Sequence, residues 1–396
     1  MYDAIIVGAG ISGISLAFQL AQKDQKVLVL EASPQLGGCI QSAKDEAQDH
    51  FWIEMGAHTT YNSYGAFIRL IEACDWLQEL MPREKVPYKI YKKGKLKSVV
   101  SPVNKLEALF SVPRIFWQKK EGETVKSYYS KILGNHNYER YFKHIFAAVP
   151  CQSVDDFPAD MLFKKREKRK DILKSFTLKN GLQSLIEKMA HHPNIKVITN
   201  TRVNQVELLE EAKKAHLTDG QSFEGKQLAI ATPPHVAQRL VKDINEDLTM
   251  ALAKIPVAYS EAMGVVVKKS DLKLPEVAGI FAPRSDFFSV VSRDVVGHER
   301  YRGFVFHFKP NVGSDAVKEN IICEVLGIRK DHFQKLYKKE NILPSLRLGQ
   351  DELVKTIDQQ SKANGLHFTG NYFLGLSIED CVQRSETIAE RMLHRP

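Results

Sequence analysis

The sequence predicts an α/β protein that combines a Rossmann-type domain with a mixed-sheet domain and a helical insert. Three observations lead to this class. Residues 2–21 read as a strand, a glycine loop and a helix; residues 104–174 carry helical spacing with few strand signals; and residues 258–310 are rich in strands. A chain of 396 residues is long enough for two or three domains and a sizeable core.

A glycine loop stands between an apolar strand, Tyr2–Val7, and a helix; it reads Gly8, Ala9, Gly10, Ile11, Ser12, Gly13. Gly8 allows the tight turn, Gly10 lets the backbone approach a pyrophosphate, and Gly13 lets helix and strand pack closely. Free N–H groups and the helix dipole favour a phosphate at the helix N-terminus. A glycine loop that arose by chance would not need to stand between a strand and a helix. The segment therefore predicts dinucleotide binding.

An acidic residue and a second glycine pair follow this loop. The second expected strand, Lys26–Leu30, leads into Glu31, whose carboxylate can accept hydrogen bonds from ribose hydroxyls. The pair Gly37 and Gly38 comes a few residues later, and NAD-binding Rossmann units do not need it. The combination resembles the extended FAD signature of the flavin amine oxidase and protoporphyrinogen oxidase superfamily.

The resemblance implies FAD as the cofactor, held by a Rossmann-type FAD-binding domain of the GR2-like kind. In that family the glycine pair passes close to the pyrophosphate and leads toward the flavin, which places Ala32, Gly37, Gly38 and Cys39 near the cofactor. The usual arginine before the pair is Gln35 in this chain, which removes one cationic contact to the phosphates.

The stretch Phe51–Asn62 continues the resemblance. Family members have here a strand that ends in an acid, which is Glu54 in this chain, and then a glycine turn beside the isoalloxazine ring. That turn is Gly56, Ala57 and His58. His58 is a candidate catalytic residue, because it could polarise the flavin or the substrate. The alternative is a histidine that is only hydrogen-bonded within its turn.

The middle of the chain is expected to form a helix at Tyr64–Met81, a β-hairpin around Gly94 and a mostly helical region. Family members insert a helical domain at this point, and in membrane-associated members it docks on lipid. Phe110, Phe116 and Trp117 lie close to lysines and would suit an interfacial helix. Burial in the insert's own core is the alternative that we favour.

The net charge of +9 includes two basic clusters, Lys89–Lys97 and Phe163–Lys174. A solvated face is the simpler interpretation, and contact with anionic lipid or an acidic substrate is the other. Nucleic acid is disfavoured as a partner, because no recognition motif accompanies the charge.

Residues 176–234 are expected to return to the FAD-binding domain. A helix opens within Phe176–Ala190, a strand follows at Ile195–Ile198, and the rest reads as a three-stranded antiparallel unit closed by a further strand. The resemblance places backbone groups of Val203 at the adenine and Ala231 near the cofactor.

The C-terminal third resembles protoporphyrinogen oxidases most specifically. Two helices are expected before Ile342, and Gln350 stands where the family has a histidine. Near the end, a glycine turn and an aspartate–cysteine pair keep the family's spacing, with Gly370, Asn371, Gly375, Asp380 and Cys381. Cys39 and Cys381 are expected to be small buried residues near the cofactor rather than reactive thiols.

The last expected helix is Ser377–His394. In the superfamily its N-terminus points at the pyrimidine edge of the flavin, where N–H groups around Leu376, Ser377 and Ile378 can stabilise negative charge. Glu379 and Asp380 would oppose that charge, so we expect both acids to point away from the flavin.

The resemblance covers nearly the whole chain and implies a division into six segments. The FAD-binding domain is expected in three parts, 1–84, 176–242 and 346–396. The substrate domain is expected in two parts, 85–103 and 243–345, and the helical insert at 104–175.

The implied activity is that of an FAD-dependent oxidase that removes a hydride from a carbon next to nitrogen, with O₂ as the acceptor. Protoporphyrinogen, a tetrapyrrole of heme biosynthesis, is the first candidate substrate. Hydride transfer depends on alignment with the cofactor more than on a titratable group. A propionate of the substrate would need a cation, for which Lys89 and Lys92 are candidates; the alternative is that both are ordinary surface lysines.

Three other functions fit the same motifs. A flavin amine oxidase would act on a smaller amine, a cyclic imine or a pyrroline. A polyene desaturase would bind a long apolar chain at the membrane. A redox-silent flavoprotein would bind FAD as an assembly or binding factor without turnover.

The five cysteines are scattered and form no CxxC pair, which disfavours a disulfide framework and a metal site. The chain opens almost directly on a strand, and no apolar run approaches the ~18 residues of a transmembrane helix. We therefore expect a cytoplasmic protein with at most a peripheral contact to a membrane. The oligomeric state is not predicted.

Overall fold

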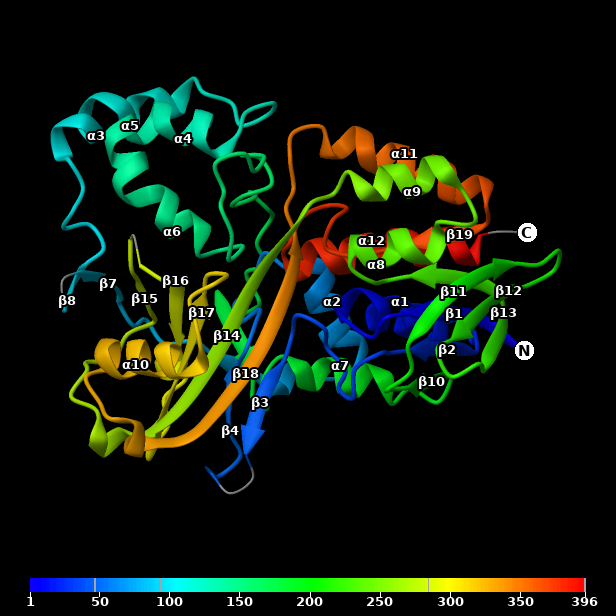
Figure 1. Ribbon diagram of the computed structural model, residues 1–396, viewed down its shortest axis with the longest axis horizontal. Coiled ribbons are helices and arrows are strands. Elements are labelled where there is room, and N and C mark those ends of the chain that lie inside the picture. The colour runs from blue at the N-terminus through cyan, green and yellow to red at the C-terminus, as the bar shows by residue number, and fades with distance from the viewer. Residues whose placement is uncertain (46–47, 93, 284, 395–396) are drawn as a thin grey trace.

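The computed structural model describes residues 1–45, 48–92, 94–283 and 285–394. Two sheets lie side by side, one at the right and one at the lower left of Figure 1, and a group of helices lies above the left sheet. The N- and C-terminal ends of the chain both lie at the right-hand side. The α/β class is confirmed.

The first sheet has the strand order β10-β2-β1-β13-β12-β11, with β19 beside β13. The strands β10, β2, β1, β13 and β19 are parallel, and β11, β12 and β13 are antiparallel. The bounds are β1 Tyr2–Val7, β2 Val27–Leu30, β10 Ile195–Ile198, β11 Val203–Leu208, β12 Lys213–Leu217, β13 Ser222–Ile230 and β19 Leu366–Phe368.

One strand, β13, takes the place of two strands that the sequence predicts separately. The third antiparallel strand and the closing strand are both β13, which pairs with β12 up to Gly225 and with β1 from Gly225 onward. The strands of this sheet come from residues assigned to the FAD-binding domain. The exact domain boundaries stay a prediction.

Helices cover the parallel part of this sheet, which explains its apolar strands. Ala4 and Ile6 pack among four helices, whereas Ile5 and Val7, which point to the opposite face, belong to another core cluster. The first group is α1 Ile11–Ala21, α2 Gly65–Ala73, α7 Gln183–Ala190 and α12 Ile378–Leu393; the second core includes α8 Pro234–Val241, α9 Glu246–Ala253 and α11 Gln350–Ala363.

The helix expected at Tyr64–Met81 is shorter than predicted. It ends at Ala73, and Asp75 then takes a left-handed backbone conformation with φ 54°. A residue with positive φ cannot continue an α-helix, so the chain turns into the short strand β6 Leu80–Pro82.

The second sheet has the order β18-β14-β17-β16-β15-β7-β8 and is antiparallel except between β15 and β7. The helix α10, Asp315–Leu326, packs on it. The strands are β7 Tyr88–Lys92, β8 Lys95–Ser98, β14 Val257–Lys268, β15 Gly279–Phe281, β16 Phe287–Ser292, β17 Tyr301–Phe308 and β18 Phe333–Pro344.

The prediction of a second helix shortly before Ile342 is wrong, because the strand β18 occupies residues 333–344. Lysines give this segment little apolar alternation, so its sequence does not signal a strand. The segment is nevertheless a strand, because it pairs with β14 along almost its whole length. Lysines are common on edge strands, where they oppose association with other sheets.

Smaller sheets join the two parts. The hairpin of β3 Ser42–Asp45 and β4 Phe51–Glu54 packs on the second sheet, and β5 Thr60–Tyr61 and β6 pair with β9 Ser175–Leu178. Contact with β4 is close: a Cβ atom at Gly303 would lie 2.2 Å from a methyl group of Ile53. Glycine at this position therefore lets the hairpin dock on the sheet.

The helical insert consists of α3 Lys105–Ser111, α4 Val125–Leu133, α5 Asn135–Asn137 and α6 Lys143–Ala147, with a π-helical turn at Tyr138–Phe142. Its helices end earlier than expected, because residues 148–174 form neither helix nor strand. Aromatic residues of α4 and α6 fill its core, where the rings of Tyr129 and Phe146 lie 4.6 Å apart.

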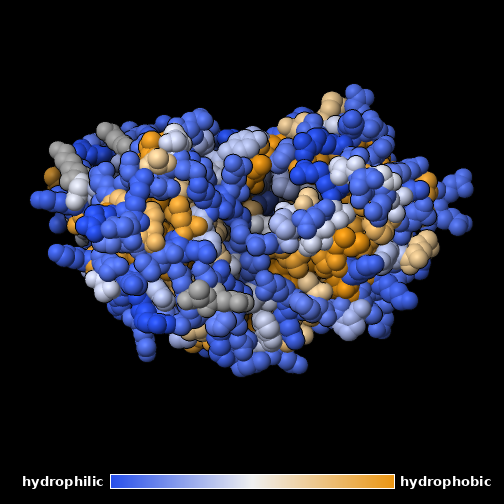
Figure 2. Space-filling view, turned by 60° about the horizontal axis from the view of Figure 1, so that its bottom comes forward, coloured by the Kyte–Doolittle hydropathy of each residue, from blue (hydrophilic) through white to orange (hydrophobic). Residues whose placement is uncertain are grey.

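The expected burial of Phe110, Phe116 and Trp117 is wrong. These side chains are 75 %, 84 % and 72 % exposed. Together with neighbouring exposed residues they form an apolar patch, which consists of Leu106, Leu109, Phe110, Val112, Ile115, Phe116 and Trp117. Figure 2 shows one face of the molecule, on which hydrophilic side chains predominate and hydrophobic side chains gather in a few areas.

Among the helices that the structure describes, none is both long enough and apolar enough to cross a membrane. Within the same described residues, no three histidine, cysteine, aspartate or glutamate side chains are grouped so that they could hold a metal ion.

Candidate active site

A cavity of about 650 Å³ lies at the carboxyl ends of β1 and β2, a size typical of ligand pockets. Strand ends of this kind are where open α/β sheets bind their ligands. Most of the residues predicted to hold the cofactor line this cavity, namely Gly8, Gly10, Ile11, Ser12, Glu31, Ala32, Gly37, Gly38, Cys39, Ala57, Val203, Ala231, Gly370, Asn371, Leu376 and Ile378.

The N-terminus of α1 faces this cavity, and no N-cap side chain accepts hydrogen bonds from the first N–H groups of the helix. Gly10 is the N-cap residue, makes no side-chain hydrogen bond, and no acidic residue lies in the first turn. The first N–H groups of such a helix lack partners within it and attract an anion. A Cβ atom at Gly10 would meet no protein atom closer than 3.9 Å. This open, donor-lined space fits the pyrophosphate of FAD.

Glu31 holds the glycine loop in place. Its Oε2 atom accepts a hydrogen bond from the Ala9 N–H group at 2.7 Å, and its Oε1 atom accepts one from the Ser33 N–H group at 2.8 Å. Carboxylate oxygens have further lone pairs, so the same group can also receive ribose hydroxyls. Ala9 itself is fully buried and does not line the cavity.

Gly13 and Gly56 are packing residues in the structure and do not line the cavity. A Cβ atom at Gly13 would lie 1.9 Å from the carbonyl oxygen of Gly8, and one at Gly56 would lie 2.0 Å from that of Cys39. Both glycines therefore let neighbouring backbone segments approach each other.

The turn before α12 is held by buried polar groups. Gln350, which replaces the family's histidine, donates through Nε2 to the carbonyl oxygen of Tyr372 at 2.6 Å. Ser377 is the N-cap of α12 and forms a capping box with Asp380, whose carboxylate accepts from the Ser377 N–H group at 3.3 Å. Ser377 is therefore engaged elsewhere, whereas Leu376 and Ile378 line the cavity.

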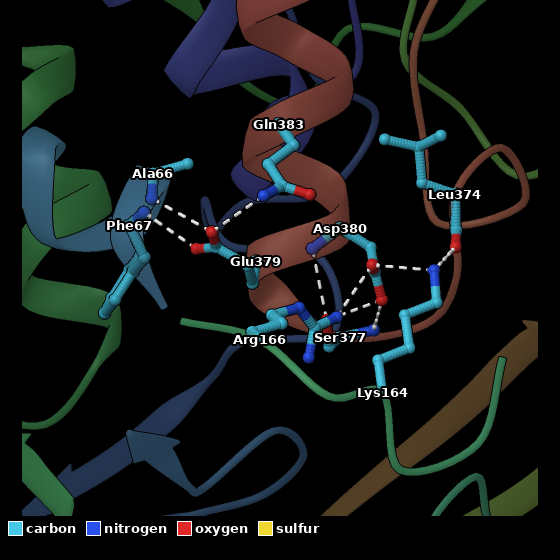
Figure 3. Close-up of polar contacts among 9 residues, drawn as sticks. All are labelled: Ala66, Phe67, Lys164, Arg166, Leu374, Ser377, Glu379, Asp380 and Gln383. Atoms are coloured by element: carbon cyan, nitrogen blue, oxygen red, sulfur yellow. Dashed lines mark hydrogen bonds and ion pairs between the residues drawn. The ribbon is translucent and has the colours of Figure 1, made fainter. Parts of the chain in front are cut away.

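Both acids in the first turn of α12 are bound by groups of other segments (Figure 3), and neither lines the cavity, as expected. Glu379 accepts hydrogen bonds from the N–H groups of Ala66 and Phe67, each at 3.0 Å, and so caps α2. Asp380 pairs with cations of another segment. Neither carboxylate lines the cavity, so neither opposes negative charge there.

The basic cluster at residues 163–174 supplies those cations and is not simply a solvated face. Lys164 lies 3.1 Å from Asp380 and donates to the Leu374 carbonyl oxygen, and Arg166 lies 2.8 Å from Asp380 (Figure 3). Asp380 is 3 % exposed. These two basic residues are internal ion-pair partners, so they fix the segment after the insert onto the helix that closes the cavity.

The other basic cluster contains the candidate Lys89, which is not near the cavity. Lys89 lies on β7, opposite Ile280 and Ser98 of the neighbouring strands, and does not line the cavity. The ammonium group of Lys92 contacts the Tyr141 hydroxyl at 3.5 Å. The structure therefore does not bring either lysine to the cofactor cavity.

His58 follows Ala57 directly but faces a different, smaller cavity. Its Nδ1 atom lies 3.0 Å from the Gly56 carbonyl oxygen. Burial and the nearby Arg83 guanidinium lower the pKa of His58 to about 4, so the imidazole is neutral at physiological pH. The turn hydrogen bond that was the alternative is present, and a catalytic role for His58 stays a prediction.

The sequence did not point to several further residues that line the cofactor cavity, among them Arg202, Asn204, Arg239 and Lys242. Arg239 and Lys242 stand three residues apart, at the end of and just after α8, a spacing that places them on the same side. Three cations thus reach a cavity that lacks the family's usual arginine at Gln35.

A Rossmann-type sheet and two glycine turns on one cavity define a flavoprotein of the FAD-binding class. The family model described as flavin containing amine oxidoreductase matches residues 11–268, about two thirds of the chain. The chain belongs to this family of flavin-containing oxidoreductases.

Solved structures of similar fold cover nearly the whole chain. A protein of Exiguobacterium sp. 255-15 with a provisional assignment as protoporphyrinogen oxidase is 15 % identical, covers 99 % of both chains and gives a TM-score of 0.82. Cyclohexylamine oxidase of Brevibacterium oxydans is 14 % identical, covers 100 % of both chains and gives a TM-score of 0.69.

Curated relatives match shorter segments. The 15-cis-phytoene desaturase of Arabidopsis thaliana is 45 % identical over 60 residues, which are 15 % of this chain and 10 % of that protein. The zeta-carotene desaturase of Zea mays is 33 % identical over 79 residues, which are 20 % of this chain and 14 % of that protein. The chain therefore matches only a small part of the length of these relatives.

Proposed function

We propose that the protein is an FAD-dependent oxidase that removes a hydride from a carbon next to nitrogen, with O₂ as the acceptor. Protoporphyrinogen is the first candidate substrate, which would place the enzyme in heme biosynthesis. The observation that carries the proposal is that three distant segments, 8–12, 37–39 and 370–378, each contribute residues to the lining of one cavity. The last of these segments has the spacing that resembles protoporphyrinogen oxidases.

FAD supplies the acceptor for the hydride. The chain's residues would bind and orient this cofactor: the N-terminus of α1 would hold phosphate, Glu31 would orient the ribose, and the Val203 backbone would hold the adenine. The N–H groups at Leu376 and Ile378 would stabilise negative charge. In an amine the C–H bond would give up a hydride, the neighbouring N–H bond a proton, and a C=N bond would form. In a porphyrinogen the hydride would leave a bridging methylene carbon, a pyrrole N–H group would give up a proton, and the double bonds of that pyrrole would shift to form a C=C bond to the bridging carbon. O₂ takes up two electrons and two protons and becomes H₂O₂.

Anaerobic flavin bleaching tests the proposed substrate class. The purified holoenzyme is mixed without O₂ with protoporphyrinogen, a panel of small amines and pyrrolines, or a polyene, and its visible absorption is followed. Protoporphyrinogen should bleach the flavin, and admitted O₂ should restore the colour with formation of H₂O₂. Bleaching by small amines alone would favour an amine oxidase, and no bleaching by any donor would favour a redox-silent flavoprotein.

The proposal includes a peripheral contact between the apolar patch and an anionic membrane. The patch is flanked by the exposed cations Lys105, Arg114 and Lys119, which suit anionic headgroups. An interfacial segment gains affinity both from buried apolar area and from such charge. A hydride donor as apolar as a porphyrinogen would benefit from this location.

Vesicle flotation measures that contact. The double variant Phe116→Ser and Trp117→Ser is expected to bind phosphatidylglycerol-containing vesicles at least about tenfold more weakly than wild type, because each aromatic side chain contributes roughly 1.5–3 kcal/mol when buried. Tyr259→Ser is the matched control, since this tyrosine is 56 % exposed but lies on β14. Equal flotation of the double variant and wild type would rule out the patch as the membrane contact.

A further inference from the structure

The smaller cavity beside the cofactor cavity is lined by cations that the proposed mechanism does not use. It has a volume of about 30 Å³, which is room for about two water-sized groups. Arg83, Arg293, His58, Glu54 and the hydroxyl-bearing Thr177 line it. Arg83, Arg293 and His58 are only partly buried.

Both arginines lack an ion-pair partner within 4.0 Å in the part of the chain that the structure describes. The Arg293 guanidinium lies 4.5 Å from the centres of the Phe51 and Trp52 rings and donates to the Val296 carbonyl oxygen at 2.6 Å, while its Nε–H group is buried without an acceptor. Arg83 donates to the His58 carbonyl oxygen at 3.0 Å. Guanidinium groups held in this way keep donors available for an anion.

The one acid that lines this cavity does not pair with either arginine. The two carboxylate oxygens of Glu54 accept from the Ser42 hydroxyl at 2.8 Å and from the Leu182 N–H group at 2.7 Å. Burial raises the pKa of Glu54 to about 7 and lowers the pKa of Arg293 to about 10. Guanidinium groups stay charged at neutral pH while Glu54 is only partly ionised, so the cavity has an excess of positive charge.

The hydroxyl of Thr177 adds a further unused donor. Its Oγ1 atom is buried and has no hydrogen-bond partner. Buried polar groups without partners are uncommon because each costs free energy. A small anion with two oxygen atoms would satisfy this hydroxyl and the free guanidinium donors together.

The position of the cavity relates its ligand to the substrate. Ala57 lines the cofactor cavity and the next residue, His58, lines the smaller one, so the two cavities are neighbours at this turn. A hydrogen bond from the Glu84 N–H group to the Val295 carbonyl oxygen, at 2.8 Å, holds the two arginine-bearing segments side by side. A group bound by the arginines would therefore anchor a molecule whose reacting carbon lies toward the cofactor.

We propose that Arg83 and Arg293 bind a carboxylate group of the substrate in this smaller cavity. The inference rests on the proposed function, and it assigns to these arginines the role that the sequence suggested for Lys89 and Lys92. The substrate is then a compound with a C–H bond next to nitrogen and a carboxylate on an arm long enough to pass the turn at residues 56–58.

Steady-state kinetics of the holoenzyme test the assignment with a carboxylate substrate and its methyl ester. Wild type should prefer the free acid. Arg83→Gln and Arg293→Gln should each raise KM for the acid by about 10-fold to 100-fold, the range expected for hydrogen bonds to a charged group, with little change for the ester. Lys85→Gln, an exposed lysine two residues from Arg83, is the control and should keep the wild-type preference.

Binding of propionate alone separates this inference from the proposed function. Propionate should raise the midpoint of thermal unfolding of wild-type holoenzyme and not that of the Arg83→Gln/Arg293→Gln variant, whether or not a turnover substrate is known. If Arg293→Gln does not fold, Arg293→Lys is used instead. It keeps the positive charge but lacks the paired guanidinium donors, so it should bind propionate more weakly than wild type. Equal stabilisation of wild type and the double variant, or loss of acid preference only in Lys89→Gln, would overturn the inference.

Discussion

Replacing Gly10 by valine is expected to give a protein that folds but purifies without FAD. The backbone of Gly10 has φ −72°, which any residue adopts, and the nearest protein atom to an added Cβ is the Gly38 Cα at 3.9 Å. The space that the side chain would fill is the space in front of the free N–H groups of α1. We expect FAD affinity to fall at least about 100-fold, which corresponds to about 2.7 kcal/mol.

The measurement is the flavin content after reconstitution, together with a thermal unfolding curve of the apoprotein. Gly13→Ala is the contrasting variant, because its Cβ would lie 1.9 Å from the Gly8 carbonyl oxygen and must disturb the packing of β1 and α1. That variant should lose stability as well as FAD. A yellow Gly10→Val protein with full flavin content would show that the pyrophosphate lies elsewhere.

Replacing Arg302 by leucine is expected to lower the free energy of unfolding by about 3–5 kcal/mol. Arg302 on β17 is 5 % exposed and binds the buried carboxylate of Asp294 through two hydrogen bonds, at 2.9 Å and 2.5 Å. It also donates to the carbonyl oxygens of Leu274 and Pro275. Without the guanidinium, the Asp294 carboxylate would keep a buried charge with the Val277 N–H group as its remaining hydrogen-bond donor.

Denaturant unfolding of the substitution and its controls separates the pair from other effects. Arg329→Leu breaks an ion pair with Asp331 in which both side chains are exposed, at 76 % and 62 %, and should cost less than about 1 kcal/mol. The double variant Arg302→Leu/Asp294→Leu should recover part of the stability, since it removes both charges. Equal losses in Arg302→Leu and Arg329→Leu would contradict the expectation.

The sequence predicts the cofactor half of the site well because its signals are local. A glycine loop between a strand and a helix can be read within twenty residues, and the strand Ile195–Ile198 is observed as predicted. The last helix was also predicted from the glycine turn that precedes it, and α12 runs over Ile378–Leu393 with Ser377 as its N-cap. Such features depend on residues that are neighbours in the sequence, so they can be predicted without knowledge of the rest of the fold.

What could not be predicted depends on contacts between distant segments. The strand β18 has a charged, lysine-rich sequence and becomes a strand by pairing with β14. Residues 163–174 look like an exposed basic run, yet Lys164 and Arg166 find a partner more than 200 positions away in Asp380. The arginines of the smaller cavity are likewise isolated in the sequence, and contacts such as that of Glu84 with Val295 bring their segments together.

The closure of one cavity by residues far apart in the chain also sets an order for biosynthesis. The ribosome adds more than 350 residues between the loop that ends at Gly13 and the turn that begins at Gly370, which takes roughly 20–70 s at usual elongation rates. During that time the nascent chain carries a phosphate loop but no complete flavin pocket. Contact between Ser385 and the Ser12 carbonyl oxygen, at 2.8 Å, forms only when α12 has emerged. We therefore expect full retention of FAD only after α12 has been made, so that bound flavin reports synthesis of the chain through this helix.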